Sequence, residues 1–257
     1  MRGPIFFSAS SRVWDTLEWV FGLEKMGYQG WEIVADGKYR FDQPDSFRQI
    51  RDLLEATTLR ASVHAPYSDL NIASMNYPIW KESVRQVCAC IEHAVDLNAE
   101  RVTFHPGYLS PVGKLVPGHA WGVQKEALVQ IGRYAEERGI LACLENMGGV
   151  RDFLGRFPEE LMGMTEGIHG IGITIDIGHA NTVGKVAAFL PFLGQAQHLH
   201  IHDNHGEHDE HLALGRGSIN WEEVGKAAAA YHGIAVVEGK NLEEAAQSLA
   251  VYLRWFS

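Results

Sequence analysis

Short apolar runs alternate along this chain with longer amphipathic segments. The runs are rich in Ile, Val, Leu and Phe, which are typical of strands. Eight such runs occur, at 5–9, 29–34, 59–65, 100–106, 140–146, 171–177, 197–203 and 234–239. Between them apolar residues recur at helical spacing, most clearly over 14–27, 78–99 and 120–139, and each of these segments ends near Gly or Asn.

Strand–helix alternation repeated eight times predicts a parallel sheet that closes into a barrel. An open, doubly wound sheet is the competing arrangement, and it would bind its ligand at one switch point. The polar residues that follow the runs are spread over six of them, and only a closed ring brings six strand ends together. We therefore predict an α/β fold with one domain, a (β/α)8 TIM barrel over residues 1–257.

His, Asp and Glu recur where these runs end, in the segments SVHAPY, VTFHPG, ACLENM, ITIDIGH, HLHIHDN and VVEGKN, with DEH in the loop behind HLHIHDN. The candidate metal ligands are His64, His105, Glu145, Asp176, His179, His200, Asp209, His211 and Glu238. Imidazole and carboxylate together suit Zn²⁺, with Mn²⁺ or Fe²⁺ as alternatives. Since parallel strands end at one mouth of a barrel, we expect a shared centre with several metal ions.

The seventh run allows a finer prediction. His198, His200 and His202 alternate with Leu199 and Ile201, so the three imidazoles point to one face of a strand. In a barrel that face is the interior. We expect His200 to be a ligand, His202 to contact a ligand or the substrate, and His198 to be hydrogen-bonded at a deeper level.

The charge and the chain start restrict the function further. A net charge of −10 disfavours indiscriminate binding to nucleic acid or to anionic membranes. MRGPIFFSAS is too short an apolar run for a signal peptide, and no apolar stretch long enough for a membrane span follows. We therefore expect a cytoplasmic protein without a membrane partner. Cys88, Cys90 and Cys143 are expected to be buried, reduced thiols.

The segments HAPY, FHPG, LEN, DIGH, HIHD, DEHLALGRG and VVEG have an order and spacing that resembles the xylose isomerase-like barrel superfamily. That superfamily includes the AP endonuclease family 2, with DNA endonuclease IV, and sugar isomerases and epimerases. In the endonuclease branch such positions hold three metal ions. The resemblance implies one ion on His64, His105 and Glu145, a second on Glu145, Asp176, His200 and Glu238, and a third on His179, Asp209 and His211.

A full set of three positions favours a hydrolase. Three divalent ions can hold a hydroxide, neutralise a phosphate and stabilise a departing alkoxide. The leading expectation is a metal-dependent phosphoesterase similar to endonuclease IV, acting on abasic DNA or on a small phosphate ester.

The alternative is a sugar or sugar-phosphate isomerase or epimerase with a single metal ion. It needs only Glu145, Asp176, His200 and Glu238, with Glu145 and Glu238 as the catalytic acid and base. The segment GWEIVADGKYRFD resembles this branch and lacks the arginine- and tryptophan-bearing loop that we associate with lesion recognition. A metal- or sugar-binding module without turnover is a third possibility, but binding alone does not require so many ligands.

The remaining candidates are expected to contact the substrate. Tyr67, in HAPY, matches a residue that endonucleases place against DNA, and Arg216 is of a type suited to phosphate. The predicted substrate-binding residues are Tyr67, Glu32, Asn146, His202, Arg216 and Lys240.

Overall fold

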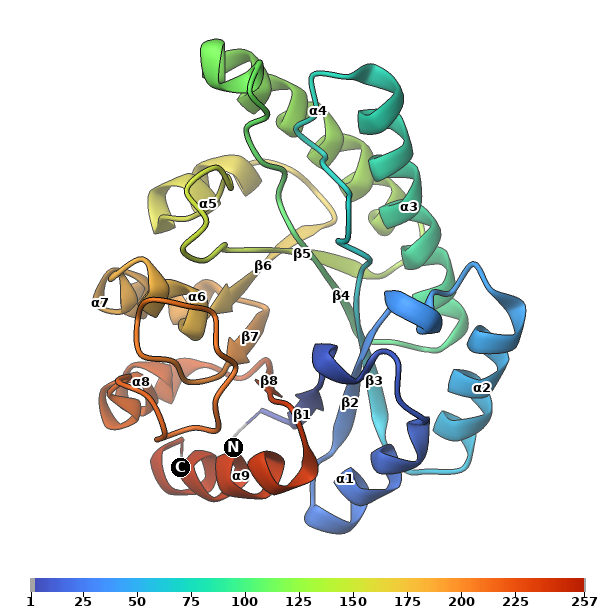
Figure 1. The fold of residues 1–257 in the computed structure, drawn as a ribbon, viewed down its shortest axis with the longest axis vertical. Coiled ribbons are helices and arrows are strands. Elements are labelled where there is room, and N and C mark those ends of the chain that lie inside the picture. The colour runs from blue at the N-terminus through green and yellow to red at the C-terminus, as the bar shows by residue number, and fades with distance from the viewer. Residues whose placement is uncertain (1–2, 257) are drawn as a thin grey trace.

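The chain folds into a closed barrel of eight parallel strands, and the computed structural model describes residues 3–256 (Figure 1). The strands pair in chain order, and the last strand closes the ring against the first. They are β1 Ile5–Ser8, β2 Gly30–Val34, β3 Arg60–His64, β4 Arg101–Phe104, β5 Leu141–Glu145, β6 Ile171–Asp176, β7 His198–Ile201 and β8 Ile234–Glu238. The prediction of a single (β/α)8 barrel is confirmed.

Helices surround the strands on the outside of the barrel (Figure 1). They are α1 Val20–Met26, α2 Pro44–Glu55, α3 Tyr77–Asp96, α4 Pro117–Glu136, α5 Pro158–Thr165, α6 Ile177–Thr182, α7 Val186–Phe189, α8 Trp221–Ala227 and α9 Leu242–Trp255. The two longest, α3 and α4, carry a proline in the first turn, where the missing N–H costs no helical hydrogen bond. Within residues 3–256, none of these helices has the length and apolar character needed to cross a bilayer.

The first predicted helix, over 14–27, is shorter in the structure. Thr16 is extended, with φ −73° and ψ 154°, and residues 17–19 form a 3-10 turn before α1 begins at Val20. Asp and Thr compete with helical hydrogen bonds, so the apolar periodicity of this segment extends beyond its helix. Gly27, at φ 98°, ends α1 in the left-handed conformation.

The barrel interior is apolar at the end where the strands begin. On β8, Ile234, Val236 and Glu238 share the inner face, since alternate residues of a strand point the same way. Ile234 and Val236 pack with Phe6 in a small cluster that is separate from the main core between strands and helices. A Cβ on Gly30 would lie 2.3 Å from the Phe6 ring, so Gly30 makes room for this plug. The plug closes the end of the barrel opposite Glu238.

Polar side chains fill the middle of the barrel. Glu32, Ser62, Thr103, Thr174 and His198 are fully buried there. Thr103 bonds Thr174 at 2.9 Å, and Glu32 Oε2 accepts from Ser62 at 2.9 Å, whereas Glu32 Oε1 and His198 Nδ1 have no hydrogen-bond partner among the described residues. We call this set the deep layer. It forms the floor beneath the open mouth.

The cysteines are free thiols, as expected, but their burial differs. Cys90 and Cys143 are buried, whereas Cys88 is only partly buried. Burial raises the pKa of Cys88 to about 11. A thiol with so high a pKa is a poor nucleophile at neutral pH, so the cysteines have a packing role.

Candidate metal centre

His64, His105 and Glu145 converge at the ends of β3, β4 and β5. His64 Nε2 lies 3.1 Å from His105 Nε2, and Glu145 Oε2 lies 3.3 Å and 3.2 Å from these two nitrogens. Ligand atoms at about 2.1 Å from a tetrahedral Zn²⁺ lie about 3.4 Å from one another. The three atoms are therefore spaced as ligands of one ion are. We call this set group one.

Four side chains from β5, β6, β7 and β8 form group two, around Nδ1 of His200. This nitrogen lies 2.8 Å from Glu145 Oε1, 3.6 Å from Glu238 Oε1 and 3.9 Å from Asp176 Oδ2. The β6–β7 register places Asp176 directly opposite His200. Because Oε2 of Glu145 faces group one and Oε1 faces group two, its carboxylate is placed to bridge the two groups.

Group three consists of His179, Asp209 and His211. Asp209 Oδ2 lies 3.4 Å from His179 Nε2 and 3.0 Å from His211 Nε2. His179 is fixed at the start of α6, where its backbone N–H bonds the Asp176 carboxylate that caps the helix. His211 has φ 48°, a left-handed conformation that is uncommon for a residue with a side chain and that recurs at functional sites.

His202 also lies within this arrangement. Its Nε2 is 3.4 Å from Asp176 Oδ1 and 3.2 Å from Asp209 Oδ1, and its ring stacks on His211 with centroids 4.2 Å apart. A Cβ on Gly178 would lie 2.0 Å from the His202 ring, so the glycine of the DIGH segment is needed for this imidazole to fit. The sequence led us to expect that His202 contacts a ligand or the substrate, and its neighbours here are candidate ligands.

Three of the imidazoles are oriented through the ring nitrogen that faces away from the groups. His64 Nδ1 bonds the Ala65 carbonyl at 2.9 Å, and His179 Nδ1 bonds the Asn146 carbonyl at 2.8 Å. His200 Nε2 lies 3.0 Å from Glu32 Oε1. When a cation displaces the proton on the inward nitrogen, an outward N–H held in this way fixes the tautomer and leaves the inward nitrogen as a lone-pair donor. This arrangement is typical of histidine ligands.

The charges at the mouth are strongly coupled. Burial acts to raise the pKa of Glu145, but His200 and hydrogen bonds from His105, His200 and His64 hold it well below the usual range. Burial acts to lower the pKa of His200, yet Glu32, Glu145 and Glu238 raise it well above the usual value. The pKa of Glu238 is raised, mainly by burial. The pKa values of the two catalytic candidates, Glu145 and Glu238, are therefore shifted in opposite directions.

The donor set fits divalent metal ions. Asp176 Oδ2 and both ring nitrogens of His202 are buried without a hydrogen-bond partner. Buried polar atoms are normally paired, and an unpaired carboxylate oxygen beside imidazole nitrogens is what a cation would satisfy. The clusters of His, Glu and Asp therefore indicate binding of divalent metal, in agreement with the sequence-based expectation of a metal cofactor.

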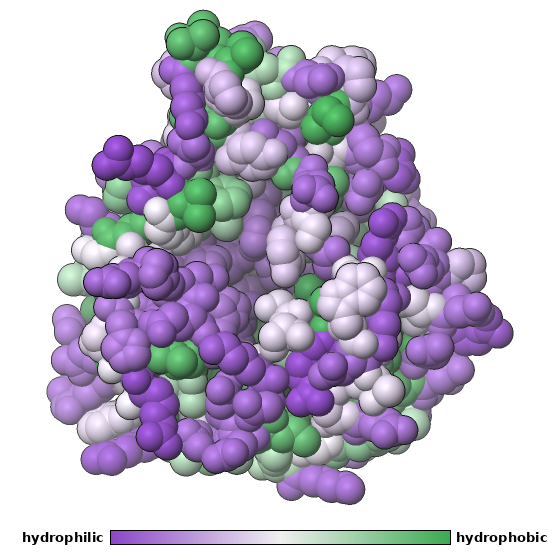
Figure 2. Space-filling model, in the orientation of Figure 1, coloured by the Kyte–Doolittle hydropathy of each residue, from purple (hydrophilic) through white to green (hydrophobic). Residues whose placement is uncertain are grey.

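Two adjoining cavities open above the groups, at the hollow in the middle of the face in Figure 2. The mouth cavity, of ≈ 160 Å³, is lined by Ser10, Val34, His64, Tyr67, His105, Glu145, His179, Asp209, His211 and Glu238. The outer cavity, of ≈ 390 Å³, is lined by Pro66, Tyr67, Asp69, Leu70, Ile72, Val87, His105, Pro106, Tyr108, Met147, Phe153, His179 and Asp209. Neither of these linings, both drawn from the described residues, includes a lysine or an arginine.

The predicted substrate-binding residues occupy different places. Tyr67 lines both cavities, and burial together with Asp36, Glu238 and Glu145 raises its pKa to about 12. Asn146 is fully buried and joins β5 to β6 through two hydrogen bonds with the backbone of Asp176. Glu32 is fully buried in the deep layer beneath the groups.

Arg216 and Lys240 are exposed and line neither cavity. The Arg216 guanidinium bonds Gln247 on α9, which holds it on the outer side of the barrel. The expectation that these two residues contact the substrate therefore gains no support from their positions.

Two aspartates that organise the mouth were not recognised in this role from the sequence. Asp203 accepts hydrogen bonds from the backbone of Asn204, Gly215 and Ile219 and from Trp221 Nε1, so it folds the loop that carries Asp209. Asp36 accepts from the backbone N–H groups of Tyr67 and Ser68 and holds the HAPY loop. Neither has a sequence signal beyond its place after a strand.

Comparison with known proteins places the chain in a family. The model of the xylose isomerase-like TIM barrel family matches residues 22–255. The uncharacterized protein MJ1311 of Methanocaldococcus jannaschii is 36% identical over 253 residues, which cover 94% of this chain and 86% of the relative. The chain belongs to the xylose isomerase-like TIM barrel family, and the resemblance seen in its motifs is confirmed.

Two further relatives represent the two branches. A solved structure described as a D-tagatose 3-epimerase-like protein superimposes with a TM-score of 0.90 at 34% identity, covering 98% of this chain and 96% of that chain. A probable endonuclease 4 of Mycobacterium leprae is 29% identical over 69% of this chain and 71% of its own length. Fold, family and clustered ligands together indicate a metal-binding enzyme, and the similarity is greater on the epimerase side than on the endonuclease side.

Proposed function

We propose that this protein is a divalent-metal-dependent isomerase or epimerase of an uncharged sugar, with Glu145 and Glu238 as its acid–base pair. The observation that carries the proposal is the lining of the two cavities, which has carboxylates, imidazoles and aromatic rings but no lysine or arginine. Phosphate groups are usually bound by such cations. A neutral polyol needs none. The similarity to the D-tagatose 3-epimerase-like protein supports the same substrate class.

The chemistry requires one metal position, and group two fits it. A divalent ion held there by Glu145, Asp176, His200 and Glu238 would polarise a carbonyl and bind a neighbouring hydroxyl oxygen. Glu145 and Glu238 enter from β5 and β8, on different sides of the barrel mouth. They can therefore approach a bound sugar from two directions.

The two glutamates differ in the direction of their pKa shifts. Histidines hold the pKa of Glu145 low, and burial raises that of Glu238. An ionised carboxylate accepts a proton from the carbon beside a carbonyl, and a protonated carboxyl group returns one to the other face. We assign Glu145 as the base and Glu238 as the acid in one direction, with the roles exchanged in the reverse reaction.

The test is proton exchange in D₂O. Metal-loaded protein is incubated with a panel of neutral ketoses, and NMR follows deuterium incorporation next to the carbonyl together with any new sugar. Glu145→Gln and Glu238→Gln should each abolish incorporation. Glu222→Gln, on exposed α8 and paired with Lys226, should retain it. Cleavage of abasic duplex DNA without deuterium incorporation into any ketose would contradict the proposal.

A phosphoesterase is the second candidate, and group three favours it. A single-metal isomerase has no use for His179, Asp209 and His211, yet the structure places Asp209 Oδ2 3.4 Å from His179 Nε2 and 3.0 Å from His211 Nε2. With all three groups loaded, the ions themselves would supply the positive charge that the cavity lining lacks. The probable endonuclease 4 relative supports this reading.

A further inference from the structure

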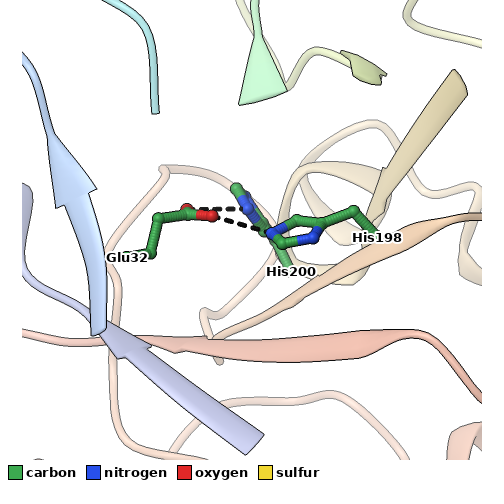
Figure 3. Close-up of side chains that lie close together, drawn as sticks. All are labelled: Glu32, His198 and His200. Atoms are coloured by element: carbon green, nitrogen blue, oxygen red, sulfur yellow. Dashed lines mark hydrogen bonds and ion pairs between the residues drawn. The ribbon is translucent and has the colours of Figure 1, made fainter. Parts of the chain in front are cut away.

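Glu32 is the one acidic side chain of the deep layer. It comes from β2, and its carboxylate reaches across the barrel interior to two histidines of β7 (Figure 3). Oε2 accepts from Ser62 Oγ at 2.9 Å and lies 2.7 Å from His198 Nε2. Oε1 lies 3.0 Å from His200 Nε2. The side chain is fully buried and lines neither the mouth cavity nor the outer cavity.

The two oxygens of the Glu32 carboxylate have different partners. Ser62 and His198 hold Oε2, which fixes the plane of the carboxylate and leaves Oε1 for His200. Within the described chain Oε1 has no hydrogen-bond partner and is held by its ion pair with His200, so Ser62, His198 and His200 together set the geometry of the carboxylate. The β2–β3 register, which sets Glu32 opposite Ser62, provides it.

The contact with Glu32 also affects Nδ1, on the opposite side of the His200 ring. Both ring nitrogens of His200 face carboxylates: Nδ1 hydrogen-bonds Glu145 Oε1 at 2.8 Å, and Nε2 forms an ion pair with Glu32 Oε1. A divalent cation bound among Glu145, Glu238 and Asp176 would replace the proton on Nδ1 and leave the Nε2–H facing Glu32. His64 and His179 are oriented by backbone carbonyls instead. A carboxylate partner makes an imidazole a stronger donor to a metal than a carbonyl partner does.

We propose that Glu32 is a positioning residue of the metal centre: it fixes the tautomer and orientation of His200 so that Nδ1 binds a divalent cation in group two. His198 and Ser62 hold Glu32 in place for this role. The inference rests on the metal centre of the proposed function and not on the identity of the substrate.

The experiment compares Glu32→Gln with Thr103→Val. An amide has one oxygen and one NH₂ group, so Gln cannot accept from His198 and His200 at the same time. Thr103→Val removes a buried hydrogen bond from the same layer, to Thr174, and touches neither histidine. Zn²⁺ affinity is measured by competition with a chromophoric chelator. The tautomer of His200 is read from long-range ¹H–¹⁵N NMR of the metal-free protein at a pH above the pKa of His200, where the ring has lost one proton.

In the Glu32→Gln protein we expect Zn²⁺ binding at one position to weaken by about 10- to 100-fold, with an unchanged number of ions at saturation. His200 should lose its pure Nε2–H form. Thr103→Val should match the wild type in both readouts. Glu32→Asp, which keeps the charge on a shorter side chain, should recover part of the affinity and shows whether a weak Gln variant has simply misfolded.

Three outcomes distinguish the ideas. Wild-type affinity and tautomer in Glu32→Gln would overturn the positioning role. Loss of one whole ion at saturation would also overturn it, because Glu32 would then be a ligand of a separate ion with His198. A wild-type protein that binds no divalent ion would instead overturn the metal centre of the proposed function.

Discussion

The deep layer and the mouth of the barrel contain similar side chains, but the polar atoms of these side chains have different kinds of partner. In the deep layer Ser62 and His198 bond Glu32 Oε2, and Thr103 bonds Thr174. At the mouth, His64 and His105 direct two ring nitrogens at each other beside one carboxylate oxygen. The first arrangement is held by hydrogen bonds within the protein, and only Glu32 Oε1 and His198 Nδ1 of these five side chains lack a hydrogen-bond partner in residues 3–256. The second becomes favourable when a cation lies between the donors, because lone pairs that face one another repel.

The difference shows how polar groups in one barrel can serve two purposes. Pairing within the chain gives the deep layer a fixed geometry, and that geometry is passed to the mouth through the contact between Glu32 and His200. The mouth keeps unpaired atoms, such as Asp176 Oδ2, at positions that a ligand can reach. Four predictions separate the two layers.

The largest effect is expected from Glu145→Gln, since this side chain belongs to groups one and two. The variant should lose metal at both positions, and its turnover should fall by at least about 10²- to 10⁴-fold. Elemental analysis and the deuterium exchange assay measure the two effects. Full activity with a normal metal content would remove Glu145 from the mechanism.

Removal of metal should destabilise the mouth and spare the deep layer. An ion present at 1,000 times its dissociation constant contributes about 4 kcal/mol to the stability of the folded state. For a chain of this size that amounts to a fall in Tm of roughly 10 °C on chelation. Calorimetry with EDTA, and then with Zn²⁺ restored, tests this. A Tm that stays constant while the metal is shown to leave would contradict the role of these donors.

Metal affinity should rise with pH. Burial acts to lower the pKa of the mouth histidines, but nearby carboxylates raise the pKa of His179 and His200 well above the usual value and that of His202 to about 9. A raised pKa keeps these imidazoles protonated at neutral pH in the metal-free protein, and a proton competes with a cation for the same lone pair. Titrations at pH 6, 7 and 8 should show about tenfold tighter binding per pH unit for each proton released. Constant affinity would mean that these imidazoles are not ligands.

The smallest effect on sugar chemistry is expected from His211→Ala. This change removes one ligand of group three and none of group two, so sugar isomerisation should stay within a few-fold of the wild type. Phosphoesterase activity, where present, should disappear. Parallel assays with ketoses and with abasic DNA decide between the two candidate functions, since a variant that loses sugar turnover would couple group three to the isomerase.

Much of the fold and part of the site could be read from the sequence. The eight apolar runs predicted the barrel, and the alternation of His198, His200 and His202 predicted a shared inner face, with His198 hydrogen-bonded at depth as found. The first helix was predicted too long, because the spacing of apolar residues does not reveal that Thr16 is extended. Arg216 was expected near the substrate, but a residue's place after a strand does not tell which way its loop turns.

The sequence by itself determined the architecture and the list of candidate metal-binding side chains, because strand periodicity and strand-end position are local properties. Only the tertiary structure decided which of them meet. Glu145 is shared between two groups, and Glu32 contacts His200, so each of these contacts joins residues far apart in the chain. The described cavity linings, which contain no lysine or arginine, are likewise built from distant segments. Such contacts depend on register and on barrel closure, which local pattern does not contain.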